Sequence, residues 1–159
     1  MPNHFADQNQ RKRVLNPEMT TINKLSSKTK VVIADARFQA LWKMGRRDQA
    51  IRVYRGIGRL FWHAEAVGRH YERRGQMGRA VVEYEYLVSE YNKMRKDFLP
   101  LPKGPRELFV LGRWYADKDQ VKARQYLATY LSAEKVWARD PAFRLRHKTA
   151  TKTILKKLK

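Results

Sequence analysis

Residues 64–84 carry the clearest pattern in this chain, and they read Ala64-Glu-Ala-Val-Gly68-Arg-His-Tyr71-Glu-Arg-Arg-Gly75-Gln-Met-Gly-Arg-Ala80-Val-Val-Glu-Tyr84. Before Gly75, small and apolar residues recur every three or four positions, which is the spacing of one side of an α-helix. The same spacing starts again after Gly75 with Ala80 and Tyr84. Glycine often ends a helix because it adopts the left-handed conformation without steric cost. The stretch therefore predicts two antiparallel helices joined at Gly75.

The same pattern occurs on both sides of this stretch. Gly45 and Gly75 lie 30 residues apart, three prolines within residues 93–106 exclude a helix there, and a further helical pattern follows. Before Gly45 we expect a core-facing apolar row, formed by Val32, Ala36, Ala40 and Met44 and widened by Phe38, Leu41 and Trp42. Repeating helix pairs of this length are typical of helical-repeat proteins. The sequence thus predicts an all-α fold, a short α-solenoid of about three antiparallel helix pairs over residues 31–135.

The order of residue types in 64–84 resembles a tetratricopeptide repeat. A small residue, a glycine, an aromatic residue, an inter-helix glycine, an alanine and a second aromatic residue occur at the spacing of that family. The copy before it has Phe38 in the place of the family glycine, and the copy after it is one residue short before Ala123. The resemblance covers about residues 31–135 and implies stacked helix pairs with a concave groove.

Two glycines are expected where helices cross closely. Gly68 and Gly112 occupy corresponding positions, and the small residues expected to face them are Ala80 and Ala123. A larger side chain at either glycine would push the helices apart, at a cost of about 1–3 kcal/mol. We therefore interpret these positions as structural.

Much of the positive charge lies at the two ends of the chain. The chain has 35 Lys and Arg against 15 Asp and Glu, a formal charge of +20. Residues 1–33 carry six basic and two acidic residues, and residues 136–159 carry eight and one. We interpret residues 1–30 as a basic extended arm with at most one helical turn. Residues 136–159 are interpreted as a basic C-terminal helix or tail, whose apolar residues are too sparse for a full core face. A polyanion relieves self-repulsion of this size, which indicates nucleic acid, and RNA in particular, as the partner.

The candidate RNA-binding residues are basic residues of both ends and one row in the body of the chain. In that row Arg52, Arg55 and Arg59 lie at i, i+3 and i+7, with His63 one turn beyond, so that they would share one helix face. One arginine guanidinium can donate two parallel hydrogen bonds to phosphate oxygens, and its plane can stack on bases. The alternatives are a solvated helix face for the row and solubilising tails for the ends. The full set is Arg11, Lys12, Arg13, Lys24, Lys28, Lys30, Arg52, Arg55, Arg59, Arg144, Arg146, Lys148, Lys152, Lys156, Lys157 and Lys159.

A second hypothesis follows from the family resemblance. An adaptor of tetratricopeptide type would bind acidic peptides in its groove, and the candidate protein-binding residues are Trp62, Arg69 and Arg73. We expect Trp62 to be exposed. A simpler interpretation of Arg69 is an ion pair with Glu65, one helical turn before it.

No motif in the sequence indicates catalysis. The absence of cysteine excludes a disulfide scaffold, a thiol nucleophile and a Cys-ligated zinc site. The four histidines are scattered, and no glycine-rich phosphate loop occurs. The longest apolar run is about four residues, whereas a spanning helix needs roughly 20. We expect no enzymatic activity, metal, cofactor, small-molecule substrate or membrane association.

These features predict a non-catalytic, structural RNA-binding component of a large ribonucleoprotein, in contact with RNA and with neighbouring proteins. By analogy with other helical-repeat proteins that carry basic extensions, we favour a ribosomal protein that binds rRNA in the mitochondrial ribosome, with the cytoplasm as the alternative location. A DNA-binding regulator is a weaker alternative because no recognition-helix motif is present.

Overall fold

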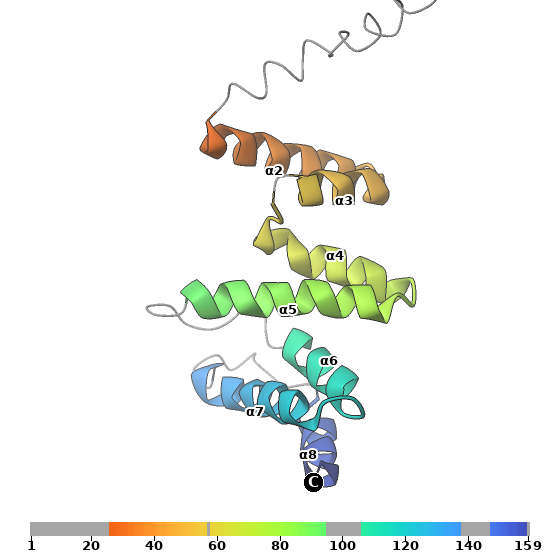
Figure 1. Cartoon of the computed structure of the whole chain (residues 1–159), viewed down its shortest axis with the longest axis vertical. Coiled ribbons are helices and arrows are strands. Elements are labelled where there is room, and N and C mark those ends of the chain that lie inside the picture. The colour runs from red at the N-terminus through yellow and green to blue at the C-terminus, as the bar shows by residue number, and fades with distance from the viewer. Residues whose placement is uncertain (1–25, 57, 95–105, 138–146, 159) are drawn as a thin grey trace, which may run out of the picture. The chain divides into compact units, whose positions relative to one another are not determined.

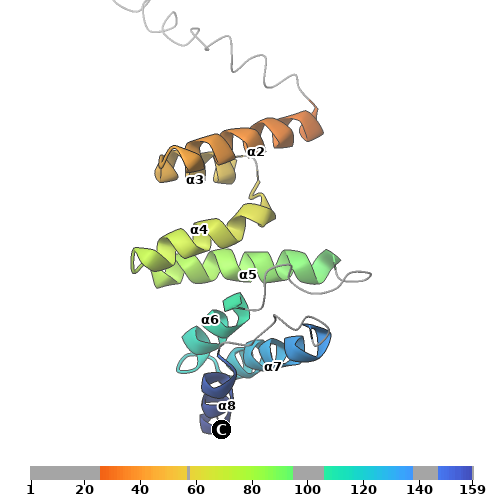
Figure 2. The same ribbon diagram turned by 180° about the vertical axis from the view of Figure 1, so that it is seen from behind.

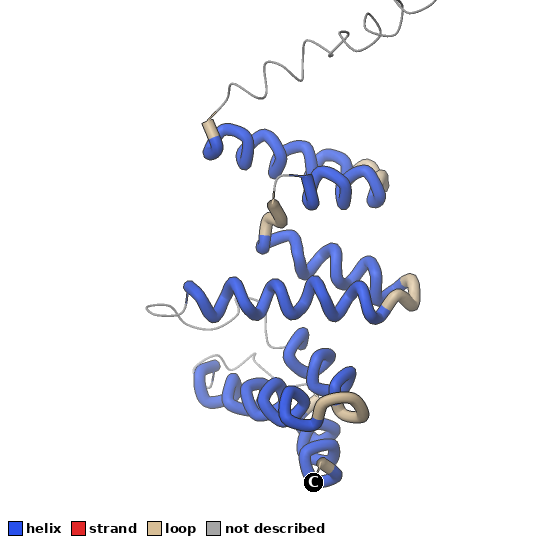
Figure 3. Tube along the Cα trace, in the orientation of Figure 1, coloured by secondary structure: helices blue, strands red, loops and turns tan. Residues whose placement is uncertain are grey.

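The computed structural model describes residues 26–56, 58–94, 106–137 and 147–158, which form helices and loops without a strand (Figure 1, Figure 3). Contacts divide the chain into two compact units, Met1–Leu60 and Phe61–Lys159. The described helices are α2 (Ser27–Lys43), α3 (Arg47–Gly56), α4 (Phe61–Arg73), α5 (Met77–Met94), α6 (Arg106–Tyr115), α7 (Gln120–Trp137) and α8 (Lys148–Lys157). The all-α prediction is confirmed, and α2–α3, α4–α5 and α6–α7 are packed pairs. The stacking of all three pairs into a solenoid stays a prediction.

The first unit is built on the α2–α3 pair. Ser26 caps α2, because its Oγ accepts a hydrogen bond from the backbone N–H of Thr29 at 3.2 Å. The cap starts the helix at Ser27, earlier than the predicted start at residue 31. Lys28 and Lys30 therefore lie in the first turn of a helix and not in an extended arm.

The core of this pair does not follow the main row of apolar residues predicted for α2. Ala34 and Phe38 are buried, at 1% and 2% exposure. Val32 and Met44 are 61% and 59% exposed, and the alanines between them, Ala36 and Ala40, are exposed as well. The predicted core row is thus wrong for its four main members, whereas Phe38, which was expected to widen it, is buried as predicted. The α2 helix has apolar residues on two sides, and the side with the aromatic ring of Phe38 packs on α3.

Two of the helix pairs use the same glycine turn. Gly45 and Gly75 have φ values of 76° and 70°, in the left-handed region. In each turn the glycine N–H donates to the carbonyl three residues back, and the next N–H donates to the carbonyl five residues back. This is the Schellman arrangement, and it confirms both predicted helix ends. The third pair has no such glycine; there the Oδ1 of Asp119 accepts from the backbone N–H of Lys122 at 3.0 Å and caps α7.

In the second unit, the two helices of each pair approach closely at a glycine, as predicted: α4 meets α5 at Gly68, and α6 meets α7 at Gly112. A Cβ placed on Gly68 would lie 2.4 Å from Cε1 of Tyr84, and one on Gly112 would lie 2.4 Å from a methyl group of Leu127. The atoms nearest each glycine therefore belong to large residues, each four positions after the predicted alanine. Ala80 and Ala123 are fully buried, but the glycines accommodate the ring and the leucine. In both pairs, a glycine of the first helix leaves room for a large side chain of the second helix.

The α8 helix lies next to α7 in the second unit (Figure 2). Ile154, Leu155 and Leu158 pack against a cluster of α6 and α7 that includes Leu108 and Leu127. The sequence suggested that the apolar residues of this segment were too sparse for a core face. They suffice because α8 needs to cover only the apolar side left open by α6–α7.

Candidate nucleic-acid interface

Positive charge is unevenly divided among the helix pairs. Residues 26–60, which form α2–α3, contain nine Lys and Arg and two Asp. Residues 61–94, which form α4–α5, contain five basic and five acidic residues and are neutral. The α8 segment 147–158 has four lysines and no acidic residue. A polyanion would therefore be attracted to α2–α3 and to α8 and not to the α4–α5 pair.

Two of the arginines predicted to bind phosphate lie on the outside of α3. Arg52 and Arg55 are exposed, on the side away from the buried Ala50, Ile51 and Tyr54. They are three residues apart on a helix, so their guanidinium groups can reach neighbouring phosphates of one strand.

The prediction that Arg59 and His63 continue this helix face is wrong. The α3 helix ends at Gly56 and α4 begins at Phe61. Gly58, with φ 62°, lies in the connection between them together with Arg59. Arg59 and His63 therefore do not continue the helix face of Arg52 and Arg55. The glycines at 56 and 58 were the signal in the sequence that could have revealed this break.

The α8 helix presents a second group of cations. Lys152, Lys156 and Lys157 are exposed, and Lys148 is half-buried at the first position of the helix. The helix is fixed by its apolar side and by Arg124, which donates to the backbone carbonyl of Leu158 at 2.5 Å. Before α8, the ring of His147 stacks on that of Phe109 with centroids 4.1 Å apart. These lysines are thus held on a docked helix.

The remaining predicted RNA-binding residues lie either on α2 or in segments that the structure does not describe. Lys28 is exposed and Lys30 is half-buried on the first turn of α2. Seven predicted RNA-binding residues lie outside the described residues: Arg11, Lys12, Arg13, Lys24, Arg144, Arg146 and Lys159.

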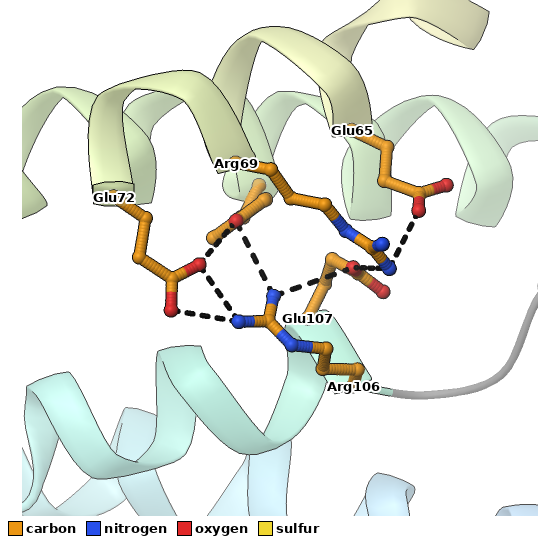
Figure 4. A network of polar contacts seen from close by, with 6 residues as sticks. Glu65, Arg69, Glu72, Arg106 and Glu107 are labelled. Carbon is orange, nitrogen blue, oxygen red and sulfur yellow. Dashed lines mark hydrogen bonds and ion pairs between the residues drawn. The ribbon is translucent and has the colours of Figure 1, made fainter. Parts of the chain in front are cut away.

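A network of charged residues in the second unit uses cations internally (Figure 4). Arg69 of α4 contacts Glu65 at 2.7 Å and Glu107 of α6 at 3.4 Å. Arg106 of α6 donates to both carboxylate oxygens of Glu72, at 2.7 and 2.9 Å. The predicted pair of Arg69 with Glu65 is present, whereas the contacts to α6 join residues that are far apart in the sequence and could not be predicted from spacing.

The two carboxylates next to Arg106 are tuned in opposite directions. Burial opposes ionisation of Glu72, but hydrogen bonds from Arg106 and from the Oη of Tyr84, at 2.7 Å, hold its pKa below the ordinary value. Burial raises the pKa of Glu107, which is only 4% exposed. Glu72 is thus the anion that balances Arg106, and this arginine is structural.

The candidate protein-binding residues of α4 are in different situations. Trp62 is 47% exposed, as predicted, and its ring meets that of Phe61 edge to face. Arg73 is exposed. Arg69 is held by Glu65 and Glu107. An acidic peptide would have to compete with these carboxylates for Arg69, which weakens the adaptor hypothesis.

One small cavity lies beside α6 in the second unit. Its volume is about 230 Å³, and it is lined by Glu72, Met77, Phe109, Val110, Arg113, Trp114 and Lys118. Ligand pockets usually measure roughly 300–1,000 Å³. Lys118 Nζ lies over the ring of Trp114, 4.0 Å from its centroid. We assign no ligand to this cavity.

Within the described ranges no three His, Asp or Glu residues come together as metal ligands.

Comparisons with protein-family models, with curated proteins and with solved structures each give no match for this chain. The resemblance to tetratricopeptide repeats therefore rests on the quoted residues and stays a prediction. In the described part of the chain, none of the helices combines the length and the apolar character that crossing a bilayer requires.

Proposed function

We propose that this chain is a non-catalytic RNA-binding protein, a structural component of a ribonucleoprotein, in which α2–α3 and α8 lie against the sugar-phosphate backbone. The observation that carries the proposal is the division of charge. Nine basic and two acidic residues occupy positions 26–60, whereas the α4–α5 pair is neutral. By analogy alone, we favour the mitochondrial ribosome, with rRNA as the ligand, as the assembly.

The geometry of the cations supports binding to the phosphate backbone. Arg52, Arg55, Lys152 and Lys156 extend from helices that are held by buried cores. Because the backbone of these helices is already ordered, binding costs side-chain entropy but little backbone entropy. Contacts to phosphate position a protein on RNA and do not depend on base identity. The proposed activity is therefore backbone binding with little sequence preference.

Salt titration of RNA binding tests this proposal. The full chain and a fluorescent single-stranded RNA would be compared by anisotropy between 50 and 200 mM NaCl. Each phosphate contact contributes roughly 0.7 to the slope of log affinity against log salt for a single strand. Arg52→Gln/Arg55→Gln should lower that slope by about 1.4 if both residues bind phosphate. Lys152→Gln/Lys156→Gln should do the same.

A matched control removes two cations from the neutral pair. Arg73→Gln/Lys93→Gln changes the net charge by the same amount, and both residues are exposed on α4–α5. The control should leave the slope nearly unchanged. An equal loss in all three double variants would show that only net charge matters and would overturn the assignment to α3 and α8. Full RNA affinity in both test variants would overturn RNA binding by these helices.

A further inference from the structure

The α2 helix exposes a row of apolar side chains that its own pair does not cover. The row consists of Val32, Ile33, Ala36 and Ala40 of the helix and of Met44, its C-cap residue, and we call it the outer face of α2. The three large side chains, Val32, Ile33 and Met44, are 61%, 41% and 59% exposed. Helices that are apolar on both sides are usually covered on both sides. The outer face therefore has the composition of a contact surface.

The shape of this face suits another helix. Positions 32, 36, 40 and 44 follow one another at intervals of four residues, with Ile33 beside them. Ala36 and Ala40 form a shallow centre between the larger Val32 and Met44. A ridge of side chains from a second helix packs into such a groove at an axis separation of about 8–10 Å.

The charges around the face select the partner. Lys28 lies one turn before Val32, Arg37 one turn after Ile33, and Lys43 three residues after Ala40, and all three cations are exposed. The single acidic residue of α2, Asp35, accepts a hydrogen bond from Gln39 at 2.8 Å. An approaching apolar row would thus be bordered by positive charge, which acidic flanks complement.

We propose that the outer face of α2 is the docking surface for an amphipathic acidic helix of a partner protein, one whose apolar row is bordered by Asp and Glu. A second copy of this chain is opposed by charge, because pairing two outer faces would bring the cations Lys28, Arg37 and Lys43 of one copy near those of the other. A membrane surface is disfavoured because Ala36 and Ala40 offer little apolar bulk for insertion. This surface is distinct from Arg52 and Arg55 on α3, so its test does not depend on RNA binding.

The first experiment uses synthetic peptides and the full chain. The probe is a helical peptide of about 18 residues with a leucine row bordered by glutamates. Its length of about 27 Å covers the roughly 18 Å from Val32 to Met44 with about one turn beyond each end. Its controls are a scrambled peptide of the same composition and a peptide with lysine in place of glutamate. We expect Ala36→Gln/Ala40→Gln to lower the affinity of the chain for the probe by about tenfold or more. The variant Arg52→Glu/Arg55→Glu should keep more of its affinity for the probe and should lose affinity for RNA. Equal binding of the scrambled peptide would overturn the proposal.

A charge exchange gives a second, independent result. The variant Lys28→Glu/Arg37→Glu/Lys43→Glu should no longer bind the glutamate peptide. It should bind the lysine peptide instead, because the charges around the face are reversed and the apolar row is unchanged. All three positions are exposed, so the variant should remain folded, which circular dichroism checks. Continued preference for the glutamate peptide would show that the charges around the face do not select the partner, and would overturn its assigned chemistry.

Photo-crosslinking identifies the occupant of the face directly. The variant Ile33→p-benzoylphenylalanine places a reactive group on the outer face, and mass spectrometry locates the cross-link. Attachment to the leucine row of the probe supports the proposal. Attachment to residues 1–25 of the same chain, to a second copy, or to lipid in anionic vesicles in competition with the probe would each assign the face to a different occupant and overturn it.

Discussion

Gly68 lies where α4 crosses α5, against the ring of Tyr84. Gly68→Ala would place a methyl group 2.4 Å from Cε1 of Tyr84, and that ring is fully buried with its hydroxyl bonded to Glu72. Because the ring has no room to retreat, we expect a loss of about 1–3 kcal/mol in the free energy of unfolding. Urea denaturation followed by circular dichroism measures it.

The control for this substitution is another helical glycine of the same pair. A Cβ placed on Gly78 would meet no neighbouring side chain within 4 Å, so Gly78→Ala should be neutral or stabilise α5 by up to about 1 kcal/mol. Similar losses at both glycines would mean that the close approach at Gly68 does not limit the packing of α4 on α5.

Glu72 makes the stability of the second unit depend on pH. Its pKa lies below the ordinary 4.5, because the bonds from Arg106 and Tyr84 outweigh the effect of burial. A carboxylate with a lowered pKa in the folded state contributes stability above its unfolded pKa, and that contribution is lost as pH falls through the folded value. Glu72→Gln should therefore cost about 1–3 kcal/mol at pH 7, and progressively less below pH 4.5.

Unfolding curves of Glu72→Gln and wild type between pH 7 and pH 3 measure this difference. Glu90→Gln is the matched control, because Glu90 pairs with the exposed Lys93 and surface pairs contribute only about 0–1 kcal/mol. A difference for Glu72→Gln that stays constant with pH would show that the ionised carboxylate is not what Arg106 stabilises.

At the scale of the helices, glycine and apolar spacing predicted most of the structure. Gly45 and Gly75 fixed two helix ends because positive φ values leave few other residues for those positions. Spacing failed on α2, where apolar residues on two sides give no unique inner face. It also underestimated α8, whose contribution depends on the surface of α6 and α7 that it covers.

The docking of α8 leads to a prediction for Leu158. This residue is 8% exposed and packs with Leu108 and Leu127. Leu158→Ala should cost about 2 kcal/mol or more and should speed hydrogen exchange of α8 amides before those of α6, because the lost contacts hold α8 in place. Lys157→Ala, an exposed neighbour, should change neither quantity. Exchange in α8 that is already as fast as in an unfolded peptide before any substitution would contradict the docked arrangement.

At the scale of the whole molecule, composition shows the excess of positive charge but not which cations carboxylates hold inside the fold. The net charge of +20 is evident from the sequence. That Arg69 and Arg106 are held by carboxylates depends on contacts between α4 and α6, and Arg106 meets Glu72 across 34 positions of sequence. A single sequence carries no signal for such pairs, whereas Arg69 with Glu65 follows from helical spacing.

Net charge also predicts how salt acts on the free chain. Self-repulsion at +20 opposes folding, and salt screens it, so raising NaCl from 50 to 500 mM should increase the melting temperature by several degrees. The increase should shrink when Arg52, Arg55, Lys152, Lys156 and Lys157 are all changed to Gln, because those exposed cations contribute to the repulsion. At low salt, saturating RNA should raise the melting temperature of the wild type more than that of this variant. Differential scanning fluorimetry measures all of these values. A melting temperature that falls with salt in the wild type would mean that ion pairs such as Arg106 with Glu72 outweigh the repulsion, and that the exposed cations do not need a polyanion to neutralise them.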